Sequence, residues 1–151
     1  MPDIRYVCLS DLHFGAENSI LSCLVKGDVI VDTTTASSVL DELVAALTIL
    51  IEANEDKTRK PILILNGDVL ELALASDNVA LMVFELFLDR IFPPDGEFLF
   101  DDTILYQVGN QDTHLWEAAR EVQYAHLLKR VGTGAPLPHP WHATKWYYRK
   151  D

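Results

Sequence analysis

The sequence predicts an α/β fold, a layered arrangement in which a parallel sheet forms in the order β-α-β-α-β-α. Three apolar runs have the length and composition of buried strands, at residues 4–9, 61–65 and 103–108. After the first two runs come segments in which apolar side chains recur at helical spacing, and a helix is also expected after the third. This alternation of strands and helices is typical of parallel sheets with right-handed crossover connections.

A long irregular segment separates the first strand from the first helix. Residues 10–15 turn away from the strand, and residues 16–35 show no sustained periodicity apart from a candidate short strand at 29–31. We expect this segment to be a surface excursion, with a lid or a substrate-facing insertion as the alternative. The helix that follows begins at Ser37 or Ser38, because a serine side chain accepts a hydrogen bond from a free amide of the first helical turn.

The second and third helices complete the pattern. Ser76 or Asp77 begins the second helix, and the third covers about residues 113–129. Residues 1–130 therefore form one unit, which is long enough to bury a core. The remaining stretch, 131–151, is rich in glycine and proline at its start, and we expect a loop or the beginning of a further half there.

Composition restricts the classes of protein that the chain can represent. Its 151 residues carry a formal net charge of −11, which argues against a nucleic-acid-binding surface because such surfaces are basic. No apolar run approaches the length of a membrane span, and the N-terminus lacks the pattern of a signal peptide, so we expect a cytoplasmic protein. The two cysteines, Cys8 and Cys23, have neither metal-binding nor disulfide spacing, and we expect buried, unreactive thiols.

Residues with metal-binding side chains follow each of the three predicted strands. Asp11 and His13 follow the first strand. Asp68 follows the second strand, and Asn110 follows the third. Because the carboxyl ends of neighbouring parallel strands meet at one edge of a sheet, these side chains should lie together. Two carboxylates, an imidazole and an amide oxygen form a donor set for divalent metal ions.

In their order along the chain, these motifs resemble those of the calcineurin-like metallophosphoesterase superfamily. They are Asp-x-His at 11–13, Gly-Asp at 67–68 and Gly-Asn-x-Asp at 109–112. The resemblance extends from residue 4 to about residue 130. It implies the first, metal-binding half of an αββα sandwich that hydrolyses phosphate esters.

The resemblance also implies two divalent metal ions, which can be manganese, iron or zinc. In the family pattern Asp11 and His13 hold the first ion. Asp68 bridges the two ions, and Asn110 holds the second. Two ions about 3.5–4 Å apart share a hydroxide that attacks phosphorus, and they stabilise the departing oxygen. The implied substrate is a phosphate ester.

The chain departs from the family pattern at the third motif, whose candidate catalytic residues are Asn110, Gln111, Asp112 and His114. Gln111 stands where the family has a histidine that protonates the leaving oxygen or contacts the phosphoryl group. An amide can orient a phosphate but cannot act as a general acid. His114, three residues further on, could replace that histidine. Asp112 matches the acidic residue that orients the histidine in the family, or else it caps the next helix.

The later histidines of the family and its second sheet have no counterpart after residue 130. His139 and His142 lie in a proline-rich stretch without strand patterning. The chain therefore resembles an incomplete half, and we expect it to be weakly active or inactive alone. A three-stranded sheet with helices would leave one apolar face uncovered, which predicts association through that face or with a missing C-terminal half.

A non-enzymatic interpretation competes with the hydrolase. A catalytically degenerate phosphoesterase scaffold could bind a partner through the uncovered face, and Gln111 and the missing histidines favour it. The clustered carboxylates favour the enzyme, because a scaffold has no use for them. A dinucleotide-binding domain is the third alternative, but it requires a glycine-rich turn where Asp11 and His13 stand.

Overall fold

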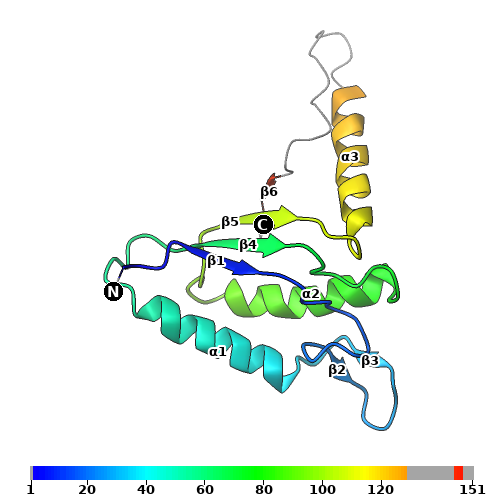
Figure 1. Cartoon of the computed structure of the whole chain (residues 1–151), viewed down its shortest axis with the longest axis horizontal. Helices are drawn as coiled ribbons and strands as arrows, with labels where there is room; N and C mark the ends of the chain where they lie inside the picture. Colours follow the sequence, from blue (N-terminus) through cyan, green and yellow to red (C-terminus); the bar gives the residue numbers. More distant parts are fainter. Residues whose placement is uncertain (1, 129–144, 148–151) are drawn as a thin grey trace.

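The structure, a computed structural model, describes residues 2–128 and 145–147. The mixed α/β class predicted from the sequence is confirmed, and three of the strands match the predicted apolar runs to within two residues (Figure 1). The elements follow in the order β1 (Tyr6–Leu9), β2 (Cys23–Leu24), β3 (Val31–Asp32), α1 (Ser38–Glu52), β4 (Ile62–Asn66), α2 (Asp77–Ile91), β5 (Thr103–Gln107), α3 (Thr113–Leu128) and β6 (Lys145–Tyr147).

The main sheet has the strand order β1-β4-β5-β6. β1 pairs in parallel with β4, and β4 pairs in parallel with β5, so the three predicted strands are neighbours. β6 joins the sheet antiparallel to β5. Part of the stretch expected to be a loop or the beginning of a further half thus adds a strand. Residues 129–144 and 148–151, which include the rest of that stretch and the predicted end of the third helix, lie outside the described residues.

Helices α1 and α2 lie on the same side of the sheet (Figure 1). Side chains alternate between the two faces of a strand, and the helix-facing set includes Leu63 and Leu65, which are fully buried. Leu40 of α1 is also fully buried in this core. Phe14, in the turn after β1, stacks on Phe87 of α2 with 5.4 Å between the ring centroids. The turn that carries the first predicted motif is therefore anchored in the core.

The predicted helix starts are confirmed, and α2 packs directly on the turn after β1. Ser37 Oγ accepts a hydrogen bond from the amide of Leu40 (3.1 Å), and Ser76 is the N-cap residue of α2. A Cβ at Gly15 would lie 2.5 Å from Cα of Ala80, and the φ angle of Gly15 is +91°. Only glycine allows the turn to approach α2 this closely.

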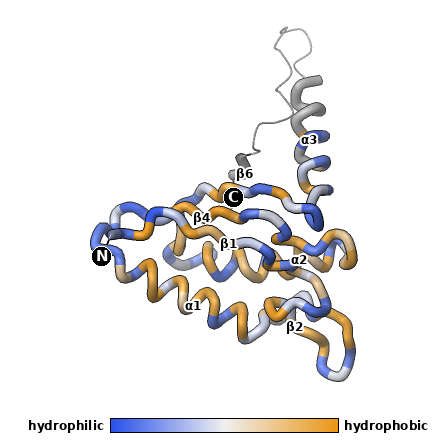
Figure 2. The backbone as a smooth tube through the Cα atoms, viewed as in Figure 1, coloured by the Kyte–Doolittle hydropathy of each residue, from blue (hydrophilic) through white to orange (hydrophobic). Residues whose placement is uncertain are grey.

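The opposite face of the sheet is left bare by α1 and α2. Tyr6 is 62% exposed, Cys8 is exposed, and Ile64 of the central strand is half-buried. Figure 2 shows that apolar residues nevertheless run through β4. The expectation of a buried thiol is wrong for Cys8, because β1 is an edge strand and alternate side chains of it stand on the bare face. Cys23, which was also expected to be buried, is half-buried.

The segment between β1 and α1 contains a small antiparallel hairpin of β2 and β3. The short strand predicted there begins later than expected, at Val31. The hairpin lies beyond the carboxyl end of β1 (Figure 1). Ser22 Oγ accepts a hydrogen bond from the amide of Gly15 (3.2 Å), so the segment is fixed to the turn that carries the first motif.

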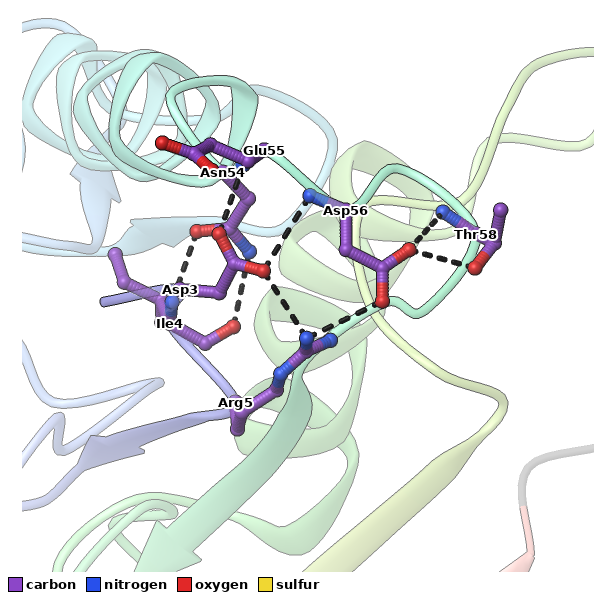
Figure 3. A network of polar contacts seen from close by, with 7 residues as sticks. All are labelled: Asp3, Ile4, Arg5, Asn54, Glu55, Asp56 and Thr58. Carbon is purple, nitrogen blue, oxygen red and sulfur yellow. Dashed lines mark hydrogen bonds and ion pairs between the residues drawn. The ribbon is translucent and has the colours of Figure 1, made fainter. Parts of the chain in front are cut away.

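A network of polar contacts lies at the opposite end of the sheet, where β1 begins (Figure 3). The buried side chain of Asn54 exchanges two hydrogen bonds with the backbone of Ile4, at 2.8 and 2.9 Å. The guanidinium of Arg5 donates to Asp3 (3.0 Å) and Asp56 (3.2 Å). The network ties the start of β1 to the loop after α1, and we assign it a role in the fold.

Candidate metal centre

The turns after β1 and β4 run side by side beyond the carboxyl ends of these strands. The amide of Asp11 donates to the carbonyl of Gly67 (3.0 Å), and the amide of His13 donates to the carbonyl of Asp68 (3.0 Å). A further parallel bridge follows one residue on. These contacts continue the β1–β4 ladder past the strand ends, so they fix the first two predicted motifs against each other.

Three of the predicted ligands meet at this point. Asp11, His13 and Asp68 each offer one donor atom, and these atoms all lie within 4.8 Å of one another. Asp11 is exposed, whereas His13 and Asp68 are half-buried, so the cluster is accessible from solvent. Two carboxylate oxygens and an imidazole nitrogen suit a divalent ion, and three protein ligands leave a coordination position for water or a substrate oxygen. The residues therefore fit the ion that the resemblance implies.

All three of these residues have a strained backbone. The φ angles of Asp11, His13 and Asp68 are 54°, 47° and 51°, and in the described part of the chain no other non-glycine residue has a positive φ. This conformation costs about 1 kcal/mol or more for each residue. Such strain persists where the surroundings impose it, and it concentrates at functional sites. The strained residues coincide with three of the four predicted ligands, which is independent support for a site here.

Glu71 holds the imidazole of His13. Its Oε2 lies 3.1 Å from His13 Nδ1, and its Oε1 accepts a hydrogen bond from the amide of Leu74 (3.1 Å). Glu71 is only 5% exposed, so these contacts replace most of the hydration of its carboxylate. A carboxylate at Nδ1 keeps the ring proton on that nitrogen and leaves Nε2 free to bind a metal, as is usual for metal-binding histidines.

Replacing Glu71 by glutamine is expected to weaken divalent metal binding about 10- to 100-fold. The glutamine oxygen would keep the hydrogen bond from Leu74, so its amide nitrogen would donate to His13 Nδ1. The ring proton would then move to Nε2 and block the ligand position. Isothermal titration with Zn²⁺ measures the loss. The control Glu117→Gln, which alters an exposed carboxylate beside His114, should keep the wild-type affinity. Equal affinities for Glu71→Gln and the wild type would contradict the role of Glu71.

The turn after β5 joins the other two turns through its main chain. The amide of Gln111 donates to Asp68 Oδ1 (2.9 Å), and the carbonyl of Gln111 accepts from the amide of Leu72 (3.1 Å). Gly109 lies so close to Asp68 that a Cβ at position 109 would overlap its carboxylate. Asn110, the fourth predicted ligand, lies between them and is exposed. Gln111 thus acts on the cluster by holding one of the two oxygens of Asp68.

Asp112 is a fully buried positioning residue. Its Oδ2 accepts hydrogen bonds from the amide of Val69 (3.0 Å) and the phenol of Tyr106 (2.6 Å), and its Oδ1 accepts from the amide of Gly109. These partners lie in β5 and in the turns after β4 and β5. Asp112 also directly precedes α3, and its backbone carbonyl accepts a hydrogen bond from the amide of Leu115 (3.1 Å), so it caps this helix through its main chain and not through its carboxylate. The carboxylate instead ties the third turn to the second and keeps Asp68 in place.

Tyr106 is expected to keep its proton wherever the protein is folded. Burial, and then the hydrogen bond to Asp112, raise the pKa of its phenol far above the ordinary value of 10. The folded state holds this proton more tightly than the unfolded chain, so the stability it contributes is complete below pH 10 and is lost as the pH rises above 10. In a spectrophotometric titration of the folded protein, wild type and Tyr106→Phe should show equal numbers of ionising phenols up to about pH 11. One phenol fewer in the variant would contradict this.

His114 pairs with a residue of its own helix. Its side chain is 67% exposed, and its Nδ1 lies 3.2 Å from Oε2 of Glu117, one turn further along α3. The group of metal-competent side chains in the described chain does not include His114. The structure therefore brings Asp11, His13 and Asp68 together and leaves His114 outside their cluster.

Two positioning residues of the site were missed by the sequence analysis. Glu71 is an acidic residue inside the apolar stretch that follows Asp68. This charged residue among apolar ones was the only sign in the sequence of a special role. Tyr106 was counted only as an apolar residue of the third strand, although its hydroxyl reaches Asp112. Each residue acts on a side chain outside its own segment: Glu71 contacts His13, and Tyr106 contacts Asp112.

Comparisons with protein-family models, with curated proteins and with solved structures find no match for this chain. Within the described ranges, no helix combines the length and the hydrophobicity that a membrane-spanning segment requires.

Proposed function

We propose that the chain is the metal-binding part of a metal-dependent phosphoester hydrolase of the calcineurin-like metallophosphoesterase type. The observation that carries this proposal is the convergence of Asp11, His13 and Asp68 at the ends of parallel strands, with donor atoms within 4.8 Å. The resemblance of the ordered motifs supports it. A cluster of three protein ligands with an open side suits catalysis, because structural metal sites are usually closed by four. The finer architecture, half of an αββα sandwich, is part of the same proposal.

Each ligand has a distinct role in this proposal. Asp11 and His13 would hold the first divalent ion. Asp68 would supply a carboxylate to this ion and to a second one, and Asn110 would contribute its amide oxygen to the second. Manganese, iron and zinc all accept such mixed ligands. When bound, two ions polarise the phosphoryl group and supply an activated water at neutral pH.

The residues around the ligands orient them and select the substrate. Glu71 keeps His13 in the tautomer that binds metal, and Asp112 holds the turn that carries Asp68. Gln111 can contact a phosphoryl oxygen but cannot give up a proton. Phosphodiesters and esters with good leaving groups are therefore favoured as substrates, because their departing oxygen needs little protonation.

The acidic composition makes metal loading a requirement for substrate binding. At a net charge of −11 the metal-free protein repels phosphate esters. Bound divalent ions are the largest charges in such a site and reverse the local field. Substrate binding should therefore depend on the metal.

Metal titration and turnover test the proposal together. The 151-residue chain should bind Zn²⁺ or Mn²⁺ in isothermal titration, and the loaded chain should hydrolyse bis(p-nitrophenyl) phosphate slowly. Chelation with EDTA should abolish the turnover. If neither ion binds, the proposal is refuted.

A catalytically degenerate binding module is the second candidate. It is favoured by Gln111 and by the bare face of the sheet, where Tyr6 and Cys8 are exposed. Metal-dependent turnover that disappears in Asp68→Asn would identify the hydrolase.

A further inference from the structure

A pocket of about 540 Å³ lies beside the turn after β1, and its lining begins two residues beyond His13 along the chain. Its walls come from the turn after β1, from the β2–β3 hairpin and from the segment that leads into α2. Its volume is in the range of pockets that bind small organic molecules. Its lining includes Gly15 and the apolar residues Ile30, Leu74 and Val79, together with the polar residues Asn18 and Ser76.

Two short connections join this pocket to His13. Gly15 follows His13 by two residues, so their Cα atoms lie within about 7 Å of each other. On the other side, the amide of Leu74 donates to Glu71, and the second oxygen of Glu71 lies 3.1 Å from His13 Nδ1. Figure 1 shows the β2–β3 hairpin and the start of α2 beyond the carboxyl ends of β1 and β4. The pocket therefore lies near His13 and is joined to it through Glu71 on the Nδ1 side of the imidazole, and the three clustered ligands do not line it.

The walls of the pocket include apolar side chains that the fold leaves in water. Leu74 is 88% exposed and Ile30 is 59% exposed. Burial of such a side chain is worth roughly 1.5–3 kcal/mol, so a ligand that covered these two would gain from them. Among the described residues that line the pocket there is no lysine or arginine, and the charged one is Glu17. An anionic group would be repelled here, whereas an uncharged apolar group would be stabilised.

We propose that this pocket binds the alcohol portion of the substrate, and that the substrates are phosphoesters of aryl or alkyl alcohols. This inference rests on the proposed function, in which the ions at Asp11, His13 and Asp68 hold the phosphoryl group. The hairpin between β1 and α1 is then a substrate-facing insertion, and not the surface excursion expected from the sequence.

Binding of two phosphonates to the zinc-loaded 151-residue chain tests the inference by calorimetry. Methylphosphonate reports on the metal centre alone, and phenylphosphonate adds an apolar ring. We expect phenylphosphonate to bind about tenfold more tightly or better, because the ring is removed from water. Leu74→Asn and Ile30→Asn should each remove most of this preference and leave methylphosphonate binding unchanged. The control Ile49→Asn alters an apolar residue of α1 that is 70% exposed and does not line the pocket, and it should keep the preference.

The two ligands separate failure of the pocket from failure of the metal centre. If methylphosphonate does not bind the zinc-loaded chain, the proposed function fails and this inference fails with it. If both phosphonates bind equally well, the apolar pocket is refuted and the metal centre stands. A phenyl preference that survives in both Leu74→Asn and Ile30→Asn would also overturn the inference, because the ring would then bind elsewhere.

Discussion

Replacing Asp68 by asparagine should abolish divalent metal binding and at the same time stabilise the metal-free fold. The loss of the shared carboxylate is expected to lower the affinity by more than about 100-fold, beyond the effect of losing a supporting residue. In the metal-free protein, the ligand atoms of Asp11 and Asp68 are at most 4.8 Å apart, and repulsion between the two carboxylates costs of order 1 kcal/mol near solvent. Asparagine also tolerates a φ of 51° well and can still accept the hydrogen bond from Gln111.

Calorimetry and urea unfolding of the same samples measure the two effects. In EDTA the free energy of unfolding of Asp68→Asn should exceed that of the wild type by about 1 kcal/mol. Asp95→Asn removes the same charge from the exposed turn after α2 and should change neither quantity. Metal affinity retained in Asp68→Asn would show that the cluster is not a metal site. If the affinity were lost and the free energy of unfolding were lower than in the wild type, only the argument from charge repulsion would be contradicted, and the metal site would stand.

The parts of the fold that the sequence predicted are those encoded in consecutive residues. The apolar runs at 61–65 and 103–108 became β4 and β5, and Ser37 caps α1, because strand and cap signals are local. The meeting of Asp11 with Asp68 was also predictable, although these residues are far apart in sequence. It follows from the rule that parallel strands place their carboxyl ends at one edge of a sheet.

The details that escaped the sequence analysis depend on contacts between distant segments. Glu71 reaches His13 across 58 residues, and Asp112 reaches Val69 across 43, with no pattern that pairs them. Cys8 was expected to be buried because an apolar strand usually is. Whether a strand has a neighbour on one side or on both is set by the whole sheet, and β1 lies at its edge.

Replacing Gly109 by alanine is expected to destabilise the fold by about 1–3 kcal/mol and to remove metal binding. A Cβ at this position would overlap both the Oδ1 and the backbone nitrogen of Asp68. That oxygen is already held by the amide of Gln111, and Asp112 binds the amide of Gly109 itself, so neither turn can move freely. The turns after β4 and β5 would have to separate, which would carry the carboxylate of Asp68 away from the cluster.

Gly27→Ala is the matched control for this substitution. Gly27 lies in the β2–β3 hairpin with a φ of +85°, and a Cβ there would meet nothing within 4 Å. Alanine at Gly27 should therefore cost about 1 kcal/mol of backbone strain and leave the metal affinity unchanged. Urea unfolding and Zn²⁺ calorimetry on both variants distinguish strain from overlap. If Gly109→Ala bound zinc as tightly as the wild type, the turn after β5 would not support Asp68. The site would then be formed by the turns after β1 and β4 alone.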